Sequence, residues 1–400
     1  MADYIKSDIK LTIGILVSNR KQHIRMVMES LKPLLVQLPS ELIAVDTKGS
    51  ETDGSIEIVR EYTDKIYPFE WCNDFSAARN VCLEHAHGEW FLYIDDDEYF
   101  DDVQELISFF QSGEAEHYQY GDFLIRNYNS DGGFSEGMVS RLIRRTEHTR
   151  FVGRIHEQFN EPGISQKVFR KAFLHHRGYA FQNDEESRLH QERNTKLLYQ
   201  ELKEQGYTPL LCAQLVQELY SREETLQDGF SHAKEAVTEL QKQGNTQDNC
   251  FQWLLTALVA YYVRCNDYTN ALKQAEHVRE NFRRSRMTEL VISGLLTECA
   301  INTQEYTMAL ESAKNYLQQW DWLQANEAVA SQLLQLDFPA YYNVEYCLFI
   351  LHAGACAANR IEQYEAAMEL WKRFPWKQPG FDGRRYFPEM QRTVVALKNK

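Results

Sequence analysis

The chain has 400 residues, 44% of them apolar and 12% aromatic, which is enough to bury the cores of two or three domains. A formal net charge of −15 at pH 7 argues against a general nucleic-acid or anionic-membrane binder, although local basic patches can still occur. The eight Cys residues lack CxxC and zinc-ligand spacing, and neither a signal core nor a membrane-spanning run is evident, so we expect a cytoplasmic protein with reduced thiols.

The first part of the chain alternates strand and helix patterns. The segments Leu11–Val17, Leu42–Val45 and Lys65–Trp71 predict strands, and helical patterns lie between them. This order indicates a parallel sheet with right-handed crossovers. Asp46 follows the second strand, where its carboxylate could accept a hydrogen bond from a base or ribose. A role as the cap of its own loop is equally compatible with the sequence.

The segment WCNDFSAARN predicts a third helix after the third strand. Asp74 is a candidate N-cap of this helix, and Arg79 lies one turn inside it. From that position the guanidinium could reach a diphosphate or an aspartate carboxylate, although an Arg on an ordinary helix surface is the alternative. We expect Gly88 to end the helix as a C′ glycine.

The stretch WFLYIDDDE, Trp90–Glu98, is the most informative part of the chain. Its apolar half predicts a strand buried on both faces, and three aspartates follow at the carboxyl end, where ligands bind in open α/β sheets. Adjacent carboxylates repel one another, so we expect a compensating cation. On an extended backbone, Asp95 and Asp97 would face one ion together while Asp96 faces away. An acidic turn that simply leaves the strand is the structural alternative.

After the acidic stretch the strands no longer alternate with helices, which predicts a mixed, antiparallel part of the sheet where an acceptor site could be built. Strands are expected at Asp122–Asn129 and Ser140–Arg145, with a turn at Asp131–Gly133 between them. Two later segments, VGRIHEQF and LHHRGY, contain Glu157 and His176. For His176, a ligand role and a structural role are balanced on the residues alone.

From about Asp184 onward helix formers dominate, and several short segments resemble one another. Ala233, Ala271 and Ala309 occupy equivalent positions at a spacing of 38 residues. Small residues at close helix crossings, repeated at such a period, are typical of helix-pair repeats, which usually present a concave surface to a peptide or protein. Tetratricopeptide units are slightly shorter, at about 34 residues. An unrelated helical bundle rich in Ala is the alternative.

Taken in order, the segments ILVSN, AVDTKGSETDGS, WCNDFSAARN and GEWFLYIDDDE resemble family 2 glycosyltransferases of the GT-A fold. The later VGRIHEQF and LHHRGY segments, followed by a helical repeat region, are similar to the bacterial branch that includes S-glycosyltransferases of glycocin-type bacteriocin peptides. The resemblance implies two domains. Residues 1–183 would form a GT-A (Rossmann-like) α/β domain with a mixed sheet, and residues 184–400 an all-α, tetratricopeptide-like repeat domain.

The resemblance also implies the residues of the site. It places Asp95 and Asp97 on a divalent metal, Mn²⁺ or Mg²⁺, between the phosphates of a UDP-sugar donor, and His176 completes the metal shell. Glu157 would be the general base. The implied donor-binding residues are Asp46, Asp74, Arg79, Asp95 and Asp96. One departure from the family pattern, Lys48 within the polar turn after the second strand, makes the contacts with the base less defined.

We therefore expect an inverting, metal-dependent hexosyltransferase that moves a sugar from a nucleotide-sugar to a peptide or protein side chain. The metal would neutralise the departing diphosphate, and a carboxylate would take the proton of the acceptor. The first alternative is a cytoplasmic enzyme acting on a lipid-linked or cell-envelope glycan, with repeats that serve a homodimer or docking. A non-catalytic, nucleotide-binding scaffold is the second. A nucleotidyltransferase would normally carry an early glycine- and basic-rich phosphate loop, which LTIGILVSNRKQH does not supply.

Overall fold

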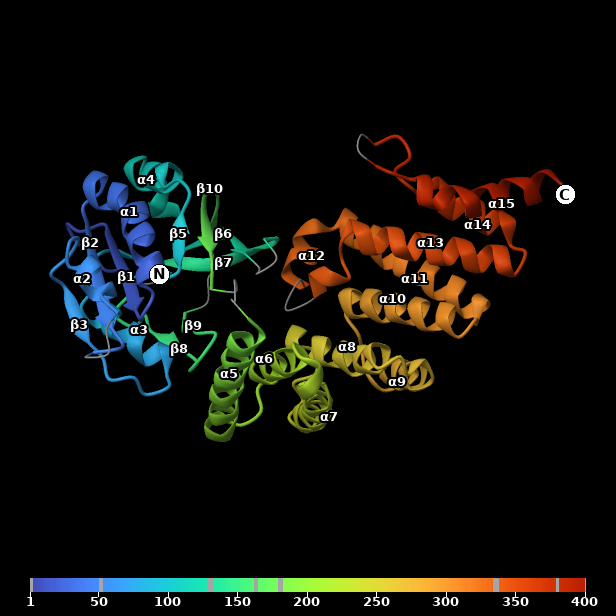
Figure 1. Cartoon of the computed structure of the whole chain (residues 1–400), viewed down its shortest axis with the longest axis horizontal. Helices are drawn as coiled ribbons and strands as arrows, with labels where there is room; N and C mark the ends of the chain where they lie inside the picture. Colours follow the sequence, from blue (N-terminus) through green and yellow to red (C-terminus); the bar gives the residue numbers. More distant parts are fainter. Residues whose placement is uncertain are drawn as a thin grey trace. The chain divides into compact units, whose positions relative to one another are not determined.

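The computed structural model describes residues 3–49, 53–128, 132–161, 165–178, 183–333, 338–378 and 381–399 (Figure 1). The chain divides into two compact units, an N-terminal unit at residues 1–197 and a C-terminal unit at residues 198–400. Helix α5 (Asp184–Gln205) begins where the sequence places the domain boundary, and the division between the units falls within this helix. In the described part of the chain, no helix has the length and apolar character needed to cross a membrane.

The N-terminal unit is the predicted α/β domain. Its strands are β1 (Leu11–Val17), β2 (Ser40–Asp46), β3 (Ile66–Pro68), β4 (Trp90–Asp95), β5 (Glu98–Phe100), β6 (Tyr120–Tyr128), β7 (Phe134–Arg144), β8 (Phe151–Val152), β9 (Gln158–Phe159) and β10 (Gln166–His176). Its helices are α1 (Lys21–Gln37), α2 (Ser55–Val59), α3 (Phe75–Glu84), α4 (Gln104–Gln111), the 3-10 turn η1 (Glu114–His117) and the first part of α5.

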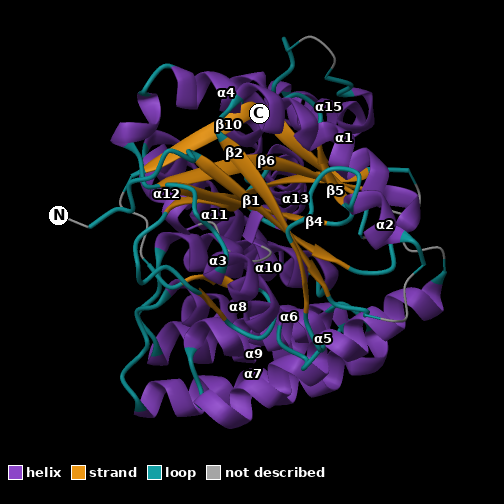
Figure 2. Ribbon diagram, turned by 90° about the vertical axis from the view of Figure 1, so that its left-hand side faces the viewer, coloured by secondary structure: helices purple, strands orange, loops and turns teal. Residues whose placement is uncertain are grey.

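Within the described residues, eight strands form one mixed sheet in the order β3-β2-β1-β4-β7-β6-β10-β5 (orange in Figure 2). Strands β3, β2, β1 and β4 are parallel, whereas β7 runs antiparallel to β4 and β6, and β5 runs antiparallel to β10. The chain moves outward from β1 through β2 to β3 and then returns to the other side of β1 as β4. The carboxyl ends of β1 and β4 therefore flank a topological switch point, where open α/β sheets bind ligands.

Apolar side chains cover both faces of the parallel strands, as their continuous apolar sequences predict. On one face, Ile13 and Ile15 of β1 pack in the same core as Met28 and Leu31 of α1. The other face has a separate core that includes Phe91 of β4 and residues of α3. Packing on both sides fixes the direction of each strand and thus the place where its carboxyl end meets solvent.

Strand β7 is longer than the sequence predicts, because it begins at Phe134 rather than Ser140. The sequence of the segment FSEG is typical of a loop, since it is polar and contains glycine. In the structure its residues are largely exposed, and pairing with β6 holds them in the strand. Arg126 of β6 lies 2.8 Å from Glu136 of this segment. The predicted turn at Asp131–Gly133 falls between these two strands, although Asp131 is outside the described residues.

The prediction that Gly88 ends the third helix is wrong. Helix α3 ends at Glu84, and its C-cap is His85. Gly88 instead lies against β1, where an added Cβ would stand 2.5 Å from the backbone nitrogen of Thr12. A side chain would collide with main-chain atoms there, so this close approach of two backbone segments requires glycine.

Glu41 is a buried carboxylate on β2. Its oxygens accept hydrogen bonds from Lys65 Nζ and Thr12 Oγ1, both at 2.5 Å, and from the backbone N–H of His87 at 2.6 Å. Burial alone would raise the pKa of Glu41, but these hydrogen bonds outweigh burial and lower the pKa from 4.5 to about 2. The folded protein therefore favours the ionised form.

We expect Glu41→Gln to lower the free energy of unfolding by about 2 kcal/mol at neutral pH, since part of the charge interaction is screened at the half-exposed Lys65. A carboxyl pKa that is depressed on folding stabilises the protein fully above pH 4.5, and this contribution is lost as the pH falls through about 2. Thermal unfolding of both proteins across this pH range tests the prediction. The difference in stability between wild type and Glu41→Gln should shrink as the pH falls. A difference that stays constant with pH would contradict the prediction.

The C-terminal unit is all-α, as predicted. After α5 it contains α6 (Pro209–Tyr220), α7 (Leu226–Lys242), α8 (Asn249–Arg264), α9 (Tyr268–Asn281), α10 (Arg286–Asn302), α11 (Tyr306–Ala325), α12 (Glu327–Leu333), α13 (Val344–Arg360), α14 (Tyr364–Lys372) and α15 (Phe387–Lys398), with 3-10 turns η2 (Glu223–Thr225), η3 (Phe338–Ala340) and η4 (Arg384–Tyr386). Helices adjacent in sequence contact each other from α6 to α11, and the alternate helices α6, α8, α10 and α13 also contact one another in turn. Stacked helix pairs pack in this way.

The repeated alanines lie in the core of the C-terminal unit. Ala233 of α7, Ala271 of α9 and Ala309 of α11 are completely buried, as small contact residues would be. Ala367 of α14 is also completely buried, and it does not continue the spacing of 38 residues. The chain between α11 and α13 contains α12 and η3, and this longer connection explains the break in the period.

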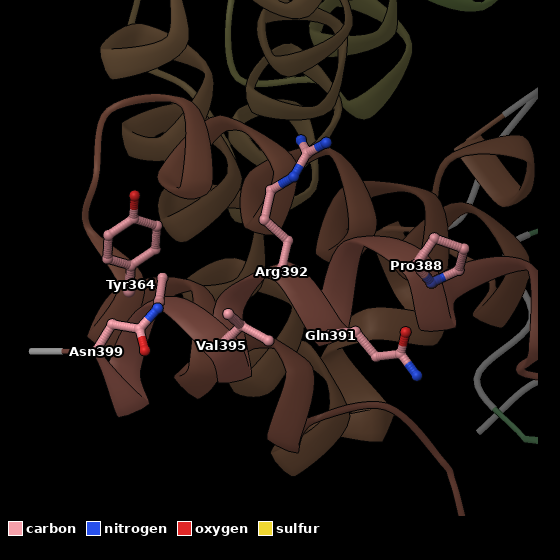
Figure 3. Close-up of a pocket in the computed structure, with 7 residues that line it drawn as sticks. Tyr364, Pro388, Gln391, Arg392, Val395 and Asn399 are labelled. Atoms are coloured by element: carbon pink, nitrogen blue, oxygen red, sulfur yellow. The ribbon is translucent and has the colours of Figure 1, made fainter.

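A hollow of about 600 Å³ lies between α14 and α15 (Figure 3). It is lined by Tyr364 of α14 and by Pro388, Gln391, Arg392, Val395, Ala396 and Asn399. All of these residues belong to the C-terminal unit, so the hollow is separate from the acidic strand end of β4.

Candidate active site

The acidic residues lie at the switch point between β1 and β4. Strand β4 ends at Asp95, and Asp96 and Asp97 form the turn that leads into β5. Asp96 Oδ2 accepts hydrogen bonds from the backbone N–H and the hydroxyl of Ser18, each at 2.6 Å, just beyond the carboxyl end of β1. Burial, followed by the negative charge of Asp97, raises the pKa of Asp96 to about 6.

We expected Asp95 and Asp97 to face one ion because alternate residues of an extended backbone point the same way. That assumption is wrong here, since the extended backbone of β4 ends at Asp95. Asp95 lies 2.5 Å from Nη2 of Arg79 and 3.3 Å from Nη2 of Arg141. Asp97 instead lies 3.1 Å from Nη1 of Arg20. The turn therefore gives the two carboxylates different cationic partners, and the role of Asp95 as a metal ligand stays a prediction.

Asp95, which is 31% exposed, is the middle member of a row of alternating charges whose other members are largely buried. We call this row the ionic chain: Glu157, Arg79, Asp95, Arg141 and Glu98. Arg79 donates to both Asp95 and Glu157, and Arg141 donates to both Asp95 and Glu98. The side chains of Arg79 and Glu98 are only 5% and 1% exposed. Removing a member would leave a neighbouring charge buried and uncompensated, which is strongly unfavourable.

The aromatic ring of Tyr93 supports both cations of the ionic chain. The guanidinium carbons of Arg79 and Arg141 lie 4.6 and 4.4 Å from its centroid. Burial would lower the pKa of Arg79, but Asp95 and then Glu157 raise it. Burial would likewise raise the pKa of Asp95, but Arg79 and then Arg141 lower it. Both groups are therefore charged in the folded protein.

Glu157 reaches the site from the loop between β8 and β9, which pair as a separate antiparallel sheet. Asn80 of α3 anchors this small sheet, since its amide group donates to the Phe151 carbonyl and accepts from the Phe151 N–H. Arg79 on the same helix then binds the Glu157 carboxylate. The alternative of an ordinary, exposed helix surface is wrong for Arg79, which is buried. The structure thus joins the predicted base to the acidic strand end through one side chain.

Asp97 and His176 face each other across a small space. His176 Nδ1 lies 2.7 Å from Asn127 Oδ1, and in the tautomer that donates to Asn127 the Nε2 lone pair points toward Asp97 Oδ1, 3.6 Å away. An added Cβ at Gly178 would stand 2.4 Å from His176 Nε2 and 2.8 Å from Asp97 Oδ2, so it would fill this space. A carboxylate and a neutral imidazole suit a divalent cation, and the residues therefore fit the predicted metal.

The described residues do not bring three or more His, Cys, Asp or Glu side chains together as a complete metal site. Asp97 and His176 would supply two protein ligands, and a metal that binds a donor diphosphate would take further ligands from phosphate oxygens. Of the three ligands that the family resemblance implies, Asp97 and His176 lie 3.6 Å apart and Asp95 lies against two arginines, and metal binding by all three stays a prediction.

Asp46 and Asp74 lie at local caps. Asp46 Oδ1 accepts hydrogen bonds from the backbone N–H groups of Lys48 and Gly49, both at 2.9 Å, as the loop-cap alternative predicts. Asp74 caps α3 through a 2.8 Å hydrogen bond from the Ala77 N–H. Contacts of these two aspartates with a donor stay predictions.

Sequence reasoning missed Arg20, Ser18 and Arg141 as members of the site. Arg20 and Ser18 follow β1, so the rule that singled out the end of β4 could have found them at the neighbouring strand end. Arg141 lies on β7, in a strand predicted without a functional role. Its contact with Asp95 joins residues that are 46 positions apart in the sequence, and no local sequence pattern predicts such a contact.

Residues 12–122 match the sequence profile of the family described as Glycosyl transferase family 2. This segment is a family 2 glycosyltransferase domain. The family 2 domain contains β1 to β5 and the acidic turn, whereas Arg141, Glu157 and His176 lie beyond the matched residues.

Two curated relatives are similar to part of the chain. The chain is 28% identical over 170 residues to the SPbeta prophage-derived glycosyltransferase SunS of Bacillus subtilis, and this match covers 40% of this chain and 37% of that protein. It is 31% identical over 150 residues to a TPR repeat-containing protein of Synechococcus elongatus, and this match covers 35% of this chain and 36% of that protein. The chain thus spans little more than a third of the length of either relative.

Among solved structures, S. aureus TarS is similar with a TM-score of 0.36 and 14% identity, covering 66% of this chain and 54% of that chain. TarS residues 1–349 in complex with UDP-GlcNAc gives a TM-score of 0.32 and 13% identity, covering 79% of this chain and 92% of that chain.

Proposed function

We propose that the chain is an inverting, metal-dependent glycosyltransferase that uses a UDP-sugar donor. One observation carries the proposal. At the switch point of a family 2 domain, Asp95 at the end of β4 and Glu157 are joined through the single guanidinium of Arg79. An acidic strand end suits a metal-bound diphosphate, and a second carboxylate close to it suits the acceptor's proton.

In this proposal Asp97 and His176 hold the divalent cation. When bound, the cation supplies positive charge to the departing diphosphate. Glu157 accepts the proton of the acceptor as the acceptor attacks the anomeric carbon, and a single displacement of this kind inverts the configuration. Arg79 keeps Glu157 in place through an ion pair with its carboxylate. Asp46, Asp74 and Asp96 are proposed to contact the donor.

We further propose that the acceptor is a peptide or protein side chain and that the helical unit binds it. The stacked helix pairs and the buried alanines support this, since repeat arrays commonly present extended surfaces to polypeptides. The functional division would then be residues 1–183 for transfer and residues 184–400 for recognition. Transfer to a lipid-linked or envelope glycan is the competing acceptor class.

Removal of the metal tests the proposed chemistry. The purified protein is incubated with UDP-glucose, UDP-galactose or UDP-N-acetylglucosamine, and release of UDP is measured with MnCl₂, with MgCl₂ or with EDTA. We expect UDP release with at least one donor and a decrease of at least tenfold with EDTA, because the diphosphate would leave without its counter-charge. Equal rates with EDTA and with metal would contradict metal dependence, and no release from any nucleotide-sugar would contradict the function.

The acceptor class is tested by mass spectrometry of peptide and glycan mixtures after reaction with the active donor. A mass increase of one hexose or N-acetylhexosamine on a peptide supports the proposal. A mass increase that appears only on molecules of the glycan fraction supports the competing acceptor class.

A further inference from the structure

Arg20 is the most exposed cation that contacts the acidic turn. Its side chain is 35% exposed, whereas those of Arg79 and Arg141 are 5% and 12% exposed. Arg20 Nη1 lies 3.1 Å from Asp97 Oδ2, and its Nε lies 3.5 Å from Asp96 Oδ1. Each carboxylate is thus approached through a single nitrogen, without the paired contacts of a bidentate salt bridge.

The backbone of Arg20 is fixed, although its side chain is accessible. Arg20 is the N-cap residue of α1, and its N–H lies 3.1 Å from both Ser55 Oγ and the Ser18 carbonyl. The side chain can therefore change partner by rotation about its own bonds, with no movement of the helix. The side chain of Asp97 is only 7% exposed, so its charge needs a compensating cation, whereas the more exposed guanidinium can leave it once another cation takes that place.

Arg20 and a divalent cation would compete for Asp97. Asp97 is the carboxylate that faces His176 across the space next to Gly178, and the same carboxylate carries the contact with Arg20. Two positive groups at one carboxylate repel each other, and a divalent ion brings twice the charge of a guanidinium. A released guanidinium at this edge would be well suited to phosphate, which it binds through two parallel N–H groups.

We propose that Arg20 is an exchangeable counter-ion: it neutralises Asp97 while no metal is bound, and it moves to the donor diphosphate when a divalent cation takes its place. The second half of this inference rests on the proposed function, because it requires a diphosphate-containing donor. The first half depends only on the contacts of Arg20 and Asp97.

The test uses the full chain and its Arg20→Gln variant. Mn²⁺ binding without nucleotide is measured from the electron paramagnetic resonance signal of free Mn²⁺, and UDP binding in the presence of Mn²⁺ is measured by calorimetry. We expect Arg20→Gln to bind Mn²⁺ about five- to tenfold more tightly, since it lacks the competing cation, and to bind UDP at least fivefold more weakly. A purely structural role for Arg20 would not tighten the binding of a metal.

Arg25→Gln is the matched control. Arg25 lies on the same helix and pairs with Glu61, and both side chains are about half exposed. This variant removes the same charge away from the turn, and we expect unchanged Mn²⁺ and UDP affinities. Arg20→Lys should give intermediate Mn²⁺ affinity, because an ammonium group keeps the charge at the end of a flexible chain.

Unchanged or weaker Mn²⁺ binding by Arg20→Gln would overturn the inference, as would a failure of both proteins to bind Mn²⁺. Tighter Mn²⁺ binding with no UDP release from any nucleotide-sugar would leave the exchange intact and reject the proposed function. UDP release together with equal Mn²⁺ affinities of the two proteins would support the proposed function and reject the exchange by Arg20.

Discussion

Asp97→Asn is expected to reduce sugar transfer by at least 100-fold. The substitution keeps the size of the side chain and removes its charge, so the cation would lose its anionic protein ligand beside His176. Asp97 is 6% exposed, and the lost charge cannot be replaced by solvent at the same position. The measurement is the donor-dependent rate of UDP release as a function of Mn²⁺ concentration. A higher Mn²⁺ requirement and a lower maximal rate should appear together.

Asp64→Asn provides the control for this substitution. Asp64 is exposed, and it lies between α2 and β3 rather than on the acidic turn. The same change of charge there should leave the rate within twofold of wild type. If Asp97→Asn retained more than a tenth of the wild-type rate at the same Mn²⁺ concentration, the assignment of Asp97 to the metal would be wrong.

Arg79→Met is expected to destabilise the N-terminal unit by about 3 kcal/mol, because it removes the buried cation shared by Glu157, which is 10% exposed, and by Asp95, which is 31% exposed and partly solvated. Methionine has a similar length and no charge, so packing against Tyr93 is partly retained while Glu157 loses its partner. Hydrogen exchange at the amides of β4, followed by mass spectrometry, reports the free energy of opening for this unit alone. Transfer activity should fall together with this stability.

Arg25→Met separates this effect from a general loss of charge. Arg25 is half exposed and forms a surface ion pair with Glu61, so its replacement should leave the opening free energy close to the wild-type value. Arg79→Lys should recover only part of the loss, because one ammonium group cannot reproduce a planar contact with two carboxylates. Equal protection of β4 in Arg79→Met and wild type would show that the ionic chain adds no stability.

Strands β1, β2 and β4 of the parallel half were predictable from sequence because each contains a continuous apolar run, whereas the predicted strand Lys65–Trp71 is shorter in the structure, Ile66–Pro68, and is not buried. The predicted Leu11–Val17 has the same bounds as β1, and the buried run at Trp90 ends at the acidic residues as expected. The first half of β7 was not predictable in this way, because cross-strand hydrogen bonds to β6, and not burial, hold the polar segment FSEG. Periodicity detects the faces of buried elements and not the pairing of exposed ones.

The candidate site was predictable at its carboxylates and at Arg79, which reaches an aspartate carboxylate as expected, but not at Arg20 and Arg141. Asp95 and Asp97 follow a strand whose burial the sequence reveals, and Glu157 and His176 were found through family resemblance. The partners of these residues come from other elements, as the contacts of Arg20 with Asp97 and of Arg141 with Asp95 show. Such contacts depend on strand order in space. Asp95 and Asp97 have different cationic partners because a turn follows β4, and the apolar run of the strand does not predict this turn.

The absence of a side chain at Gly178 has a consequence for the choice of ion. The space between Asp97 and His176 is limited on one side by main-chain atoms, which have no alternative rotamer and no titratable group. Any residue with a Cβ at position 178 would reduce the room between these two side chains, so the largest ion that could enter would be smaller.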